Sequence, residues 1–449
     1  MAPLFRVGLV APFAVFLGLY APSVGHGFIA DDFGWILHSR VADVHDLVGV
    51  FQQSRGFYRP VVAVSFAADY ALFGTHPFGY GLTNLVLAIV CGALVYLVAH
   101  ELSLPRGAAI VAAALWLLNP HGINTAILWM SGRTELLLTL GSLAAALLML
   151  RGHPFLALLP AAIALFAKEE AVVLPAILAC WWIVARPRAI DRRTLVLWAI
   201  AAAALLGVYF ALRSRTGAMT PATAPAYYRL TTDPALIARN VLEYADRAMT
   251  FSAAFALLAI LVLRPTTRIR DSWVSRDVVL CGAAWIAGGY AITVLVPVRS
   301  SLYACFPSVG ACLIAADIAA RRWESAATRP RQIGAVAAVV VSLALIPVYV
   351  LRNRATVANA RFSSAVLDDL AAATGGLPDG ASVIVLDDRS HRPNVDSAFN
   401  GAINDAFALT SGRRLDFRVE PPPLHSPSAP PCAGCARLTV HVRDGHVVH

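Results

Sequence analysis

The sequence predicts an all-α polytopic membrane protein of about eleven transmembrane helices, followed by a small C-terminal α/β domain. Of its 449 residues, 58% are hydrophobic and only 14% are charged, whereas charged residues make up roughly 25% of a typical soluble domain. The apolar residues form long uninterrupted runs, which excludes a soluble globular enzyme, a disordered chain and an outer-membrane barrel. These runs stop near residue 351, where Pro, Asp, Ser and Arg become frequent.

Eleven apolar runs account for the predicted membrane domain. A spanning helix needs about 20 mostly apolar residues, and shorter runs can be tilted or buried among neighbours. The runs are 6–22, 80–99, 107–119, 134–150, 154–167, 171–185, 194–212, 241–263, 277–297, 302–319 and 332–351. The first run is expected to stay as an anchor and not to be removed as a signal peptide. Residues 60–73 are also apolar, but Asp69 interrupts them, so we expect a helix lying at the membrane interface.

Arginines orient this domain. With the N-terminus in the cytoplasm, the turns that return to the cytoplasm hold most of the arginines. These are Arg106, Arg151, Arg186, Arg188, Arg192, Arg193, Arg264, Arg268, Arg270, Arg276, Arg321, Arg322, Arg329 and Arg331. Such a bias marks the cytoplasmic side. The formal charge of +9 therefore reflects orientation in the membrane and does not indicate a nucleic-acid partner.

The chain divides into a membrane domain, 1–351, with a long first outer loop, 23–79, and an extracytoplasmic domain, 352–449. In the second domain, 381–386, 414–419 and 437–442 are expected to be strands and 395–410 a helix. Asp444-Gly445 is a turn signal, and 421–431 is a Pro/Ser-rich loop. Cys432 and Cys435 are too few for a zinc site, and a disulfide between them is left open.

Charged residues on the predicted outer side are the candidates for chemistry, because ionisable groups near a bilayer are costly. They are Asp31, Asp32, Arg133, Glu135, Lys168, Glu169, Glu170 and Arg299. Lys168 is the single lysine of the chain. Five histidines of these loops, His26, His38, His45, His76 and His121, lack metal-ligand spacing, so no metal is expected.

The residue types suggest general-base and phosphate chemistry. A carboxylate partly desolvated at a membrane surface has a raised pKa, which suits a general base, and Asp31 or Asp32 could fill that role. The alternative for the pair is a solvated loop or a helix N-cap. Lys168 and Arg299 could hold a phosphate, as a point charge and a bidentate fork respectively. Their alternative is snorkelling to the interface, and Glu169 or Glu170 could simply neutralise Lys168.

Four stretches carry a resemblance. They are Tyr58-Arg59-Pro60 through Leu85, Asn119-Pro120-His121 through Ser131-Gly132-Arg133 and Glu135, Phe166-Ala167-Lys168-Glu169 through Pro175, and Arg299 with Leu302-Tyr303, Pro307-Ser308 and Gly310. In this order they resemble the membrane O-mannosyltransferase-like proteins that usually carry tetratricopeptide repeats, and their bacterial relatives in the GT-C glycosyltransferase superfamily. The tetratricopeptide repeats themselves are absent, and Ser300-Ser301 replaces a tighter Arg-Tyr pattern.

The resemblance implies a GT-C fold and an inverting transfer of a sugar from a polyprenyl-phosphate carrier to a hydroxyl acceptor at the outer membrane face. It implies Asp31 or Asp32 as the base and Lys168, Arg299 and Arg133 around the donor phosphate. Supporting positions inside the motifs are Arg59, Glu135, Glu169 and Tyr303. Neither a metal nor another cofactor is implied. Mannose is one candidate sugar, and the acceptor could be a protein, a lipid or a polysaccharide.

Two other classes of function remain as alternatives. A transporter or flippase for a lipid-linked sugar would place polar residues along the helix interiors and show an internal repeat, and the sequence shows neither. A non-catalytic scaffold or pseudoenzyme could retain the charged motifs while its C-terminal domain binds a partner. Frequent Ala and Arg with a single Lys suggest a GC-rich bacterial genome, and hence a plasma (inner) membrane.

Overall fold

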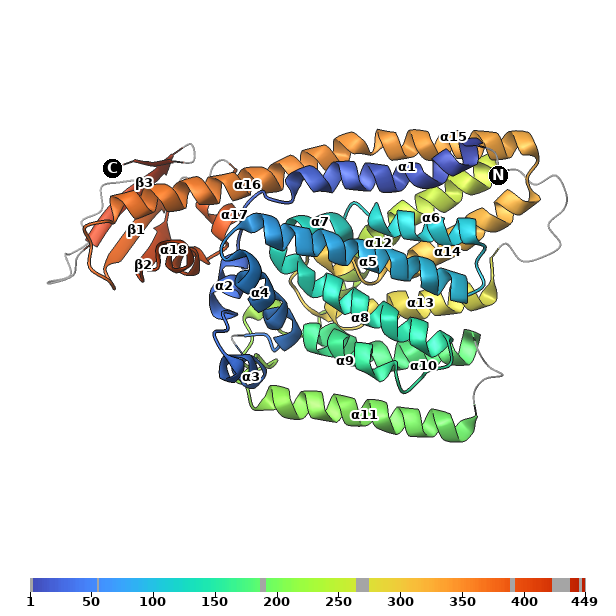
Figure 1. Ribbon diagram of the computed structural model, residues 1–449, viewed down its shortest axis with the longest axis horizontal. Helices are drawn as coiled ribbons and strands as arrows, with labels where there is room; N and C mark the ends of the chain where they lie inside the picture. Colours follow the sequence, from blue (N-terminus) through green and yellow to red (C-terminus); the bar gives the residue numbers. More distant parts are fainter. Residues whose placement is uncertain are drawn as a thin grey trace.

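The computed structural model describes residues 3–54, 56–185, 191–263, 274–387, 392–421, 437–443 and 446–448. Long helices lie side by side, with the N-terminus and the turn between α14 and α15 at one end and a small sheet beyond the other (Figure 1). We call these the N-terminal end and the sheet end of the helix bundle.

Each of the eleven predicted apolar segments contains a helix. Their bounds are α1 Pro3–Tyr20, α5 Pro77–Glu101, α6 Arg106–Leu117, α8 Arg133–Leu150, α9 Leu158–Ala167, α10 Leu174–Ala185, α11 Arg192–Ser214, α12 Pro234–Val262, α13 Arg276–Tyr290, α14 Ser308–Ser325 and α15 Thr328–Ala344. Acidic residues begin two of them, because Asp191 accepts from the backbone N–H of Arg193 and Thr194 before α11, and Asp233 accepts from that of Ala235 before α12.

Six helices of the described residues are long and apolar enough to cross a membrane. They are Pro77–Glu101, Met130–Leu150, Arg192–Ser214, Pro234–Val262, Arg276–Leu295 and Thr328–Ala373. The pair α6 and α7, bent by 60°, makes a seventh if it is one span. The protein is therefore a multi-pass membrane protein. Other apolar helices, such as α9 and α10, are shorter than a spanning helix and pack between neighbours.

Short helices and turns fill the sheet end. The helices are α2 Asp32–His38, α3 Val44–Gln52, α4 Pro60–Phe73 and α7 Gly122–Leu128. The 3-10 turns are η1 Ala21–Ser23, η2 Met130–Gly132, η3 Glu169–Val173, η5 Ala226–Tyr228, η6 Thr293–Leu295 and η7 Ser301–Ala304. The helix α4 matches the predicted 60–73 segment residue for residue. Gly122 allows α7 to touch η7, since a Cβ there would lie 2.4 Å from the backbone nitrogen of Cys305.

The C-terminal part is a four-stranded sheet with helices. The strands β1 Ser382–Asp387, β2 Asp416–Glu420, β3 Arg437–Arg443 and β4 His446–Val448 lie in the order β2-β1-β3-β4. The central β1 is parallel to β2 and β3, and β4 is antiparallel to β3. The predicted 395–410 helix is two helices, α17 Val395–Phe399 and α18 Ile403–Ser411, because Asn400 (φ 45°) and Gly401 (φ 83°) are left-handed between them.

One helix joins the two parts. The helix α16, Ile346–Ala373, follows α15 and runs through residue 351 to cover the sheet (Figure 1). The C-terminal core continues into the loop between α1 and α5, where Phe33 stacks on Phe399 with ring centroids 5.9 Å apart. The Cys432–Cys435 pair, the Asp444-Gly445 turn, the 421–431 loop beyond its first residue, and Arg186, Arg188, Arg264, Arg268 and Arg270 lie outside the described residues.

Candidate active site

The predicted site residues lie at the sheet end, in the connections that follow α1, α9 and α13 and in the first turn of α8. The connection that follows α11 meets them there, although it carries no predicted site residue. Backbone hydrogen bonds tie them together: Met219 donates to Gly56 (2.6 Å), Thr231 to Leu295 (2.7 Å) and Val298 to Tyr227 (2.9 Å). The loop with the acidic pair is also fixed from the C-terminal side, because Ala30 donates to the carbonyl of Ala398 (2.8 Å).

The two adjacent aspartates have different surroundings. Asp32 is fully buried at the start of α2, and its carboxylate accepts from the backbone N–H of Ile29 (3.0 Å) and from the N–H (2.7 Å) and hydroxyl (2.6 Å) of Ser131. Asp31 is exposed and bonds with the side chain of Asn400. Asp32 therefore links the first loop to the start of α8, whereas the Asp31 carboxylate remains accessible.

Both carboxyl groups hold their protons more tightly than usual. Burial raises the pKa of Asp32 to about 7, although the bonds from Ser131 and Ile29 oppose the rise. Solvent reaches Asp31, yet the surrounding protein removes enough hydration to raise its pKa, against the opposing effects of Arg59 and Asn400. A raised pKa makes a carboxylate a stronger base.

Arg59 and Glu169 form a bidentate ion pair beside this loop. The Arg59 guanidinium donates to both carboxylate oxygens of Glu169, at 3.0 and 2.6 Å, and lies 4.1 Å from the ring centroid of Phe57. Burial opposes the ionised form of Glu169, but Arg59 outweighs it and lowers the pKa of Glu169 to about 2. The pair joins the start of α4 to η3 and is electrically balanced.

Lys168 is buried between two carboxyl groups. Its ammonium contacts Glu135 and lies 2.8 Å from Glu170, and it sits 4.4 Å from the ring centroid of Tyr303. Burial is the largest cause that raises the pKa of Glu170, to about 8. The negative charges of Glu135 and Glu169 also raise this pKa, whereas the positive charge of Lys168 lowers it. Two carboxyl groups therefore face one ammonium, so this cluster has little spare positive charge.

Arg133 is enclosed by protein. It pairs with Asp69 at 2.6 Å and donates to the Asn84 side chain (3.1 Å), the Ser65 hydroxyl (3.0 Å) and the Tyr80 carbonyl (3.1 Å). Its side chain has no exposed surface. Asp69, which interrupts the apolar 60–73 segment, is thus the partner of Arg133. These bonds connect α4, α5 and α8 and leave no open face for a ligand.

Arg299 belongs to a cluster that the sequence did not reveal. It contacts Glu243 of α12, which also pairs with Arg239 (2.9 Å) and Arg247 (3.3 Å). Three arginines therefore share one carboxylate, and Nη1 of Arg247 is without a partner among the described residues. A signal was present, because Arg239, Glu243 and Arg247 are spaced by four residues and so lie on one helix face.

Tyrosine rings connect these clusters. Tyr303 packs edge-on against Tyr244 with ring centroids 6.2 Å apart, and the Arg247 guanidinium lies 5.9 Å from the Tyr244 centroid. Tyr228 lies close enough to Arg59, Asp31 and Lys168 for their charges to affect its pKa, which burial raises. The acidic loop, the Lys168 cluster and the arginine cluster are therefore neighbours at one end of the molecule.

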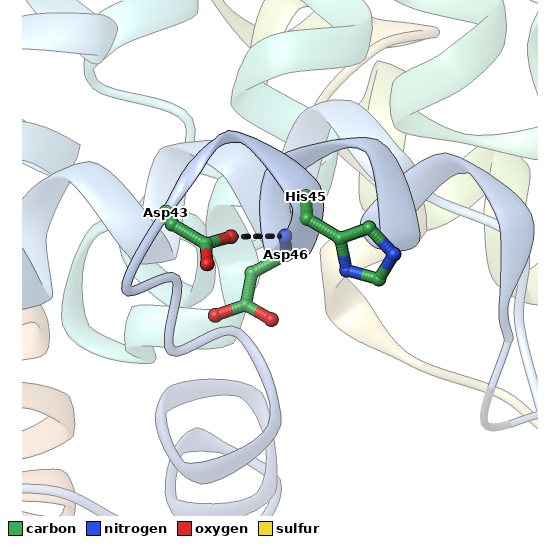
Figure 2. Close-up of side chains that lie close together, drawn as sticks. All are labelled: Asp43, His45 and Asp46. Carbon is green, nitrogen blue, oxygen red and sulfur yellow. Dashed lines mark hydrogen bonds between the residues drawn. The ribbon is translucent and has the colours of Figure 1, made fainter.

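A group of potential metal ligands lies apart from these clusters. Asp43, His45 and Asp46 are close together and exposed at the start of α3 (Figure 2). Asp43 accepts from the backbone N–H of Asp46 (2.9 Å), and Asp46 accepts from that of Ala42 (2.9 Å). These bonds are those of a helix start, so the grouping is explained by capping of α3.

The comparisons with known proteins agree with a transferase relationship. No protein-family profile matches the chain. Over 192 residues the chain is 30% identical to Protein O-mannosyl-transferase Tmtc1 of Drosophila melanogaster. The similarity covers 38% of this chain and 22% of that protein, so the chain spans less than a quarter of its relative's length. The similarity supports a relationship to a glycosyltransferase family.

Proposed function

We propose that the chain is a GT-C membrane glycosyltransferase that moves a sugar from a polyprenyl-phosphate donor to a hydroxyl acceptor at the sheet end. One observation carries this proposal: an accessible carboxylate of raised pKa, Asp31, lies at the same end as an arginine cluster with three positive charges on one negative charge. The similarity to an O-mannosyl-transferase supports it and makes mannose the first sugar to test.

Asp31 is the general base in this proposal. Asp32 already accepts three hydrogen bonds and is sealed from solvent, whereas Asp31 is exposed. Asp32 instead fixes the turn that presents Asp31. The acceptor can be a protein, a lipid or a polysaccharide, because any hydroxyl group satisfies this chemistry.

The donor phosphate is assigned to Arg299 and Arg247. Both surround Glu243, and their combined charge exceeds what that carboxylate neutralises. Lys168 packs against Tyr303 and is held by Glu135 and Glu170, so in this proposal it supports the arginine site through Tyr303, as the Arg59–Glu169 pair supports the neighbouring loop. Arg133 is left out of the phosphate site because its donors are bound within the protein.

An apolar cavity below the arginine cluster suits the prenyl chain. It has a volume of about 320 Å³ between α12 and α13, and Val241, Tyr244, Met249, Ile286 and Val294 are among its lining residues. Because Tyr244 lines the cavity and also lies near Arg247, a lipid with its chain in the cavity would bring its phosphate to the arginines.

The reaction then balances without a further cofactor. The acceptor hydroxyl gives its proton to the Asp31 carboxylate, and its oxygen bonds to the anomeric carbon from the face opposite the phosphate. The bond between that carbon and the phosphate oxygen breaks, and prenyl phosphate leaves with the electron pair. The arginines stabilise the growing negative charge, the type of electrostatic stabilisation that dominates many enzymatic rates.

The membrane arrangement is part of the proposal. The sheet end faces outward and the N-terminal end faces the cytoplasm, in a bacterial plasma membrane. The arginine-rich turns favour this orientation. Polyprenyl-phosphate sugar and membrane lipids are the partners; no nucleic acid and no metal ion are assigned.

Transfer from labelled polyprenyl-phosphate sugars in membranes containing each variant tests the proposal. Asp31→Asn should lower kcat by about 10²- to 10⁴-fold, the usual contribution of a general base. Arg247→Gln with Arg299→Gln should lower kcat and also raise the KM for the donor. The matched control is Asp43→Asn, in the same loop, which keeps a capping side chain and should leave transfer unchanged. Full transfer by Asp31→Asn would exclude Asp31 as the base, and no transfer by the wild type from any such donor would exclude the proposed activity.

A further inference from the structure

A second cavity lies toward the N-terminal end and is unrelated to the charged site. Its volume is about 510 Å³, and α1, α6, α12, α14 and α15 surround it. Its walls are almost entirely apolar, with Leu115, Phe255, Leu258 and Ala338 among the lining residues. This volume lies within the range of roughly 300–1,000 Å³ that is typical of ligand sites.

Small residues on α15 create this cavity. The helix packs along α1, while Gly334, Ala335, Ala337 and Ala338 face the cavity. Side chains of this size cannot fill the space toward α6 and α14. The side chains that line an empty cavity lack dispersion contacts on the cavity side, so a bound molecule would stabilise the fold.

The cavity opens to the surface that faces lipid. Ala254 of α12 and Val341 of α15 both line it, and both are exposed. The most apolar window of Thr328–Ala373 is only 11% buried in the protein, so α15 is surrounded mostly by the bilayer. Hydrocarbon chains are the apolar material available at that position.

The depth and charge of the cavity identify the lipid. Lining residues of α6 and its flanks run from Pro105 to Leu118, about 20 Å along a helix, which is about two thirds of a hydrocarbon core of about 30 Å. At its N-terminal end, Arg106 stands between the lining residues Pro105 and Gly107. Arg331 donates to the carbonyls of Trp323 and Glu324, both of which line the cavity (2.8 Å each). Arg106 and Arg331 therefore lie near the end of the cavity that is lined by Glu324.

We propose that this cavity is a binding site for an anionic phospholipid of the leaflet at the N-terminal end, with one acyl chain between α6, α12, α14 and α15 and the phosphate beside Arg106 and Arg331. The cavity is long enough for an acyl chain, its interior is apolar and two arginines lie near one end of it, which together match this class of lipid. The site is independent of the proposed sugar transfer.

Native mass spectrometry of the purified full-length protein, titrated with phosphatidylglycerol or with phosphatidylcholine of the same acyl chains, tests this proposal. The wild type should retain phosphatidylglycerol preferentially. Arg106→Gln and Arg331→Gln should each reduce that preference about fivefold, the equivalent of roughly 1 kcal/mol per arginine near a charged membrane surface.

Ala338→Phe should fill the cavity and reduce binding of both lipids, whereas Val336→Phe, on the exposed side of the same helix, should not. If Ala338→Phe aggregates, Ala335→Phe fills the same cavity.

Three results would overturn the proposal. The first is equal retention of the two lipids by the wild type. The second is unchanged binding by a monodisperse cavity-filling variant. The third is a change of occupant: either polyprenyl phosphate displaces phosphatidylglycerol, or the purified protein is a dimer that holds no lipid and fills the cavity with its second copy.

Discussion

Asp32 illustrates how a single buried residue can fix the conformation of a loop. It is buried, its pKa is about 7, and its three hydrogen bonds fix the turn before Asp31. Ala30, the residue before the pair, has a left-handed backbone (φ 51°) that is unusual for a non-glycine residue. The local conformation of the pair therefore depends on distant contacts with Ser131 and Ala398.

The raised pKa of Asp32 predicts a pH-dependent stability. The folded protein retains this proton up to about pH 7, whereas the unfolded chain releases it near 3.8. Between about pH 4 and 7, Asp32 ionises in the unfolded chain but stays protonated in the folded protein. The free energy of unfolding therefore falls as the pH rises through this range, by at most about 4 kcal/mol. Asp32→Asn cannot ionise and still accepts from Ser131, so it should gain stability over the wild type as the pH rises through this range. Thermal unfolding in detergent from pH 4 to 8 measures the difference, with Asp43→Asn as the control; a difference that does not vary with pH would contradict the prediction.

The sequence could identify the acidic pair but not the role of each member. Both aspartates are charged residues in a loop, and the sequence alone does not show which carboxylate faces a cleft and which one lies at the start of a helix. The choice depends on Ser131, which is 99 residues further along the chain, and on Asn400 of the C-terminal part. The role of Lys168 is equally hard to predict from the sequence. Its two carboxylate partners come from α8 and η3, and they neutralise its charge.

At the level of elements, a buried ion pair connects α4, α5 and α8. Arg133 and Asp69 pair there with almost no exposed surface, at 0% and 6% of their side chains. The sequence predicted the three helices because apolar periodicity and length are local properties. The resemblance implied Arg133 as a residue of the donor-phosphate site, and charge alone does not distinguish a buried structural arginine from one that faces a ligand.

Removing one partner of this buried pair should destabilise the protein strongly. Arg133→Gln leaves the Asp69 carboxylate without a counter-charge, which typically costs 3–5 kcal/mol. The matched control is Arg151→Gln, which breaks the exposed pair with Glu101 (2.9 Å) and should cost about 0–1 kcal/mol. Thermal unfolding of both variants in detergent compares them. An Arg133→Gln protein with wild-type stability and a raised KM for the donor would return Arg133 to the phosphate site.

At the level of the whole molecule, the C-terminal part and the loop between α1 and α5 form one structural unit. Phe28, Phe33 and Phe66 of the N-terminal segments share a hydrophobic core with Val383 and Phe399 of the C-terminal part. The sequence predicted the positions of the strands, because their apolar alternation is local. It gave no sign of the shared core, since nothing in the apolar pattern of 381–442 indicates which segment covers the sheet.

This shared core predicts that residues 352–449 do not fold independently. In the whole chain, α2 covers Phe399 and α18 with Phe33, so the separated fragment would expose that apolar surface to water. We expect the fragment to show poorly dispersed amide NMR signals and no cooperative thermal transition. In the full chain, Phe33→Ala should lower stability by about 3–5 kcal/mol and increase hydrogen exchange in β1, while Phe51→Ala, on the exposed α3 of the same loop, should change neither. A well-dispersed fragment spectrum with a cooperative transition would show that the C-terminal part is an autonomous domain, and transfer would then have to be tested without it.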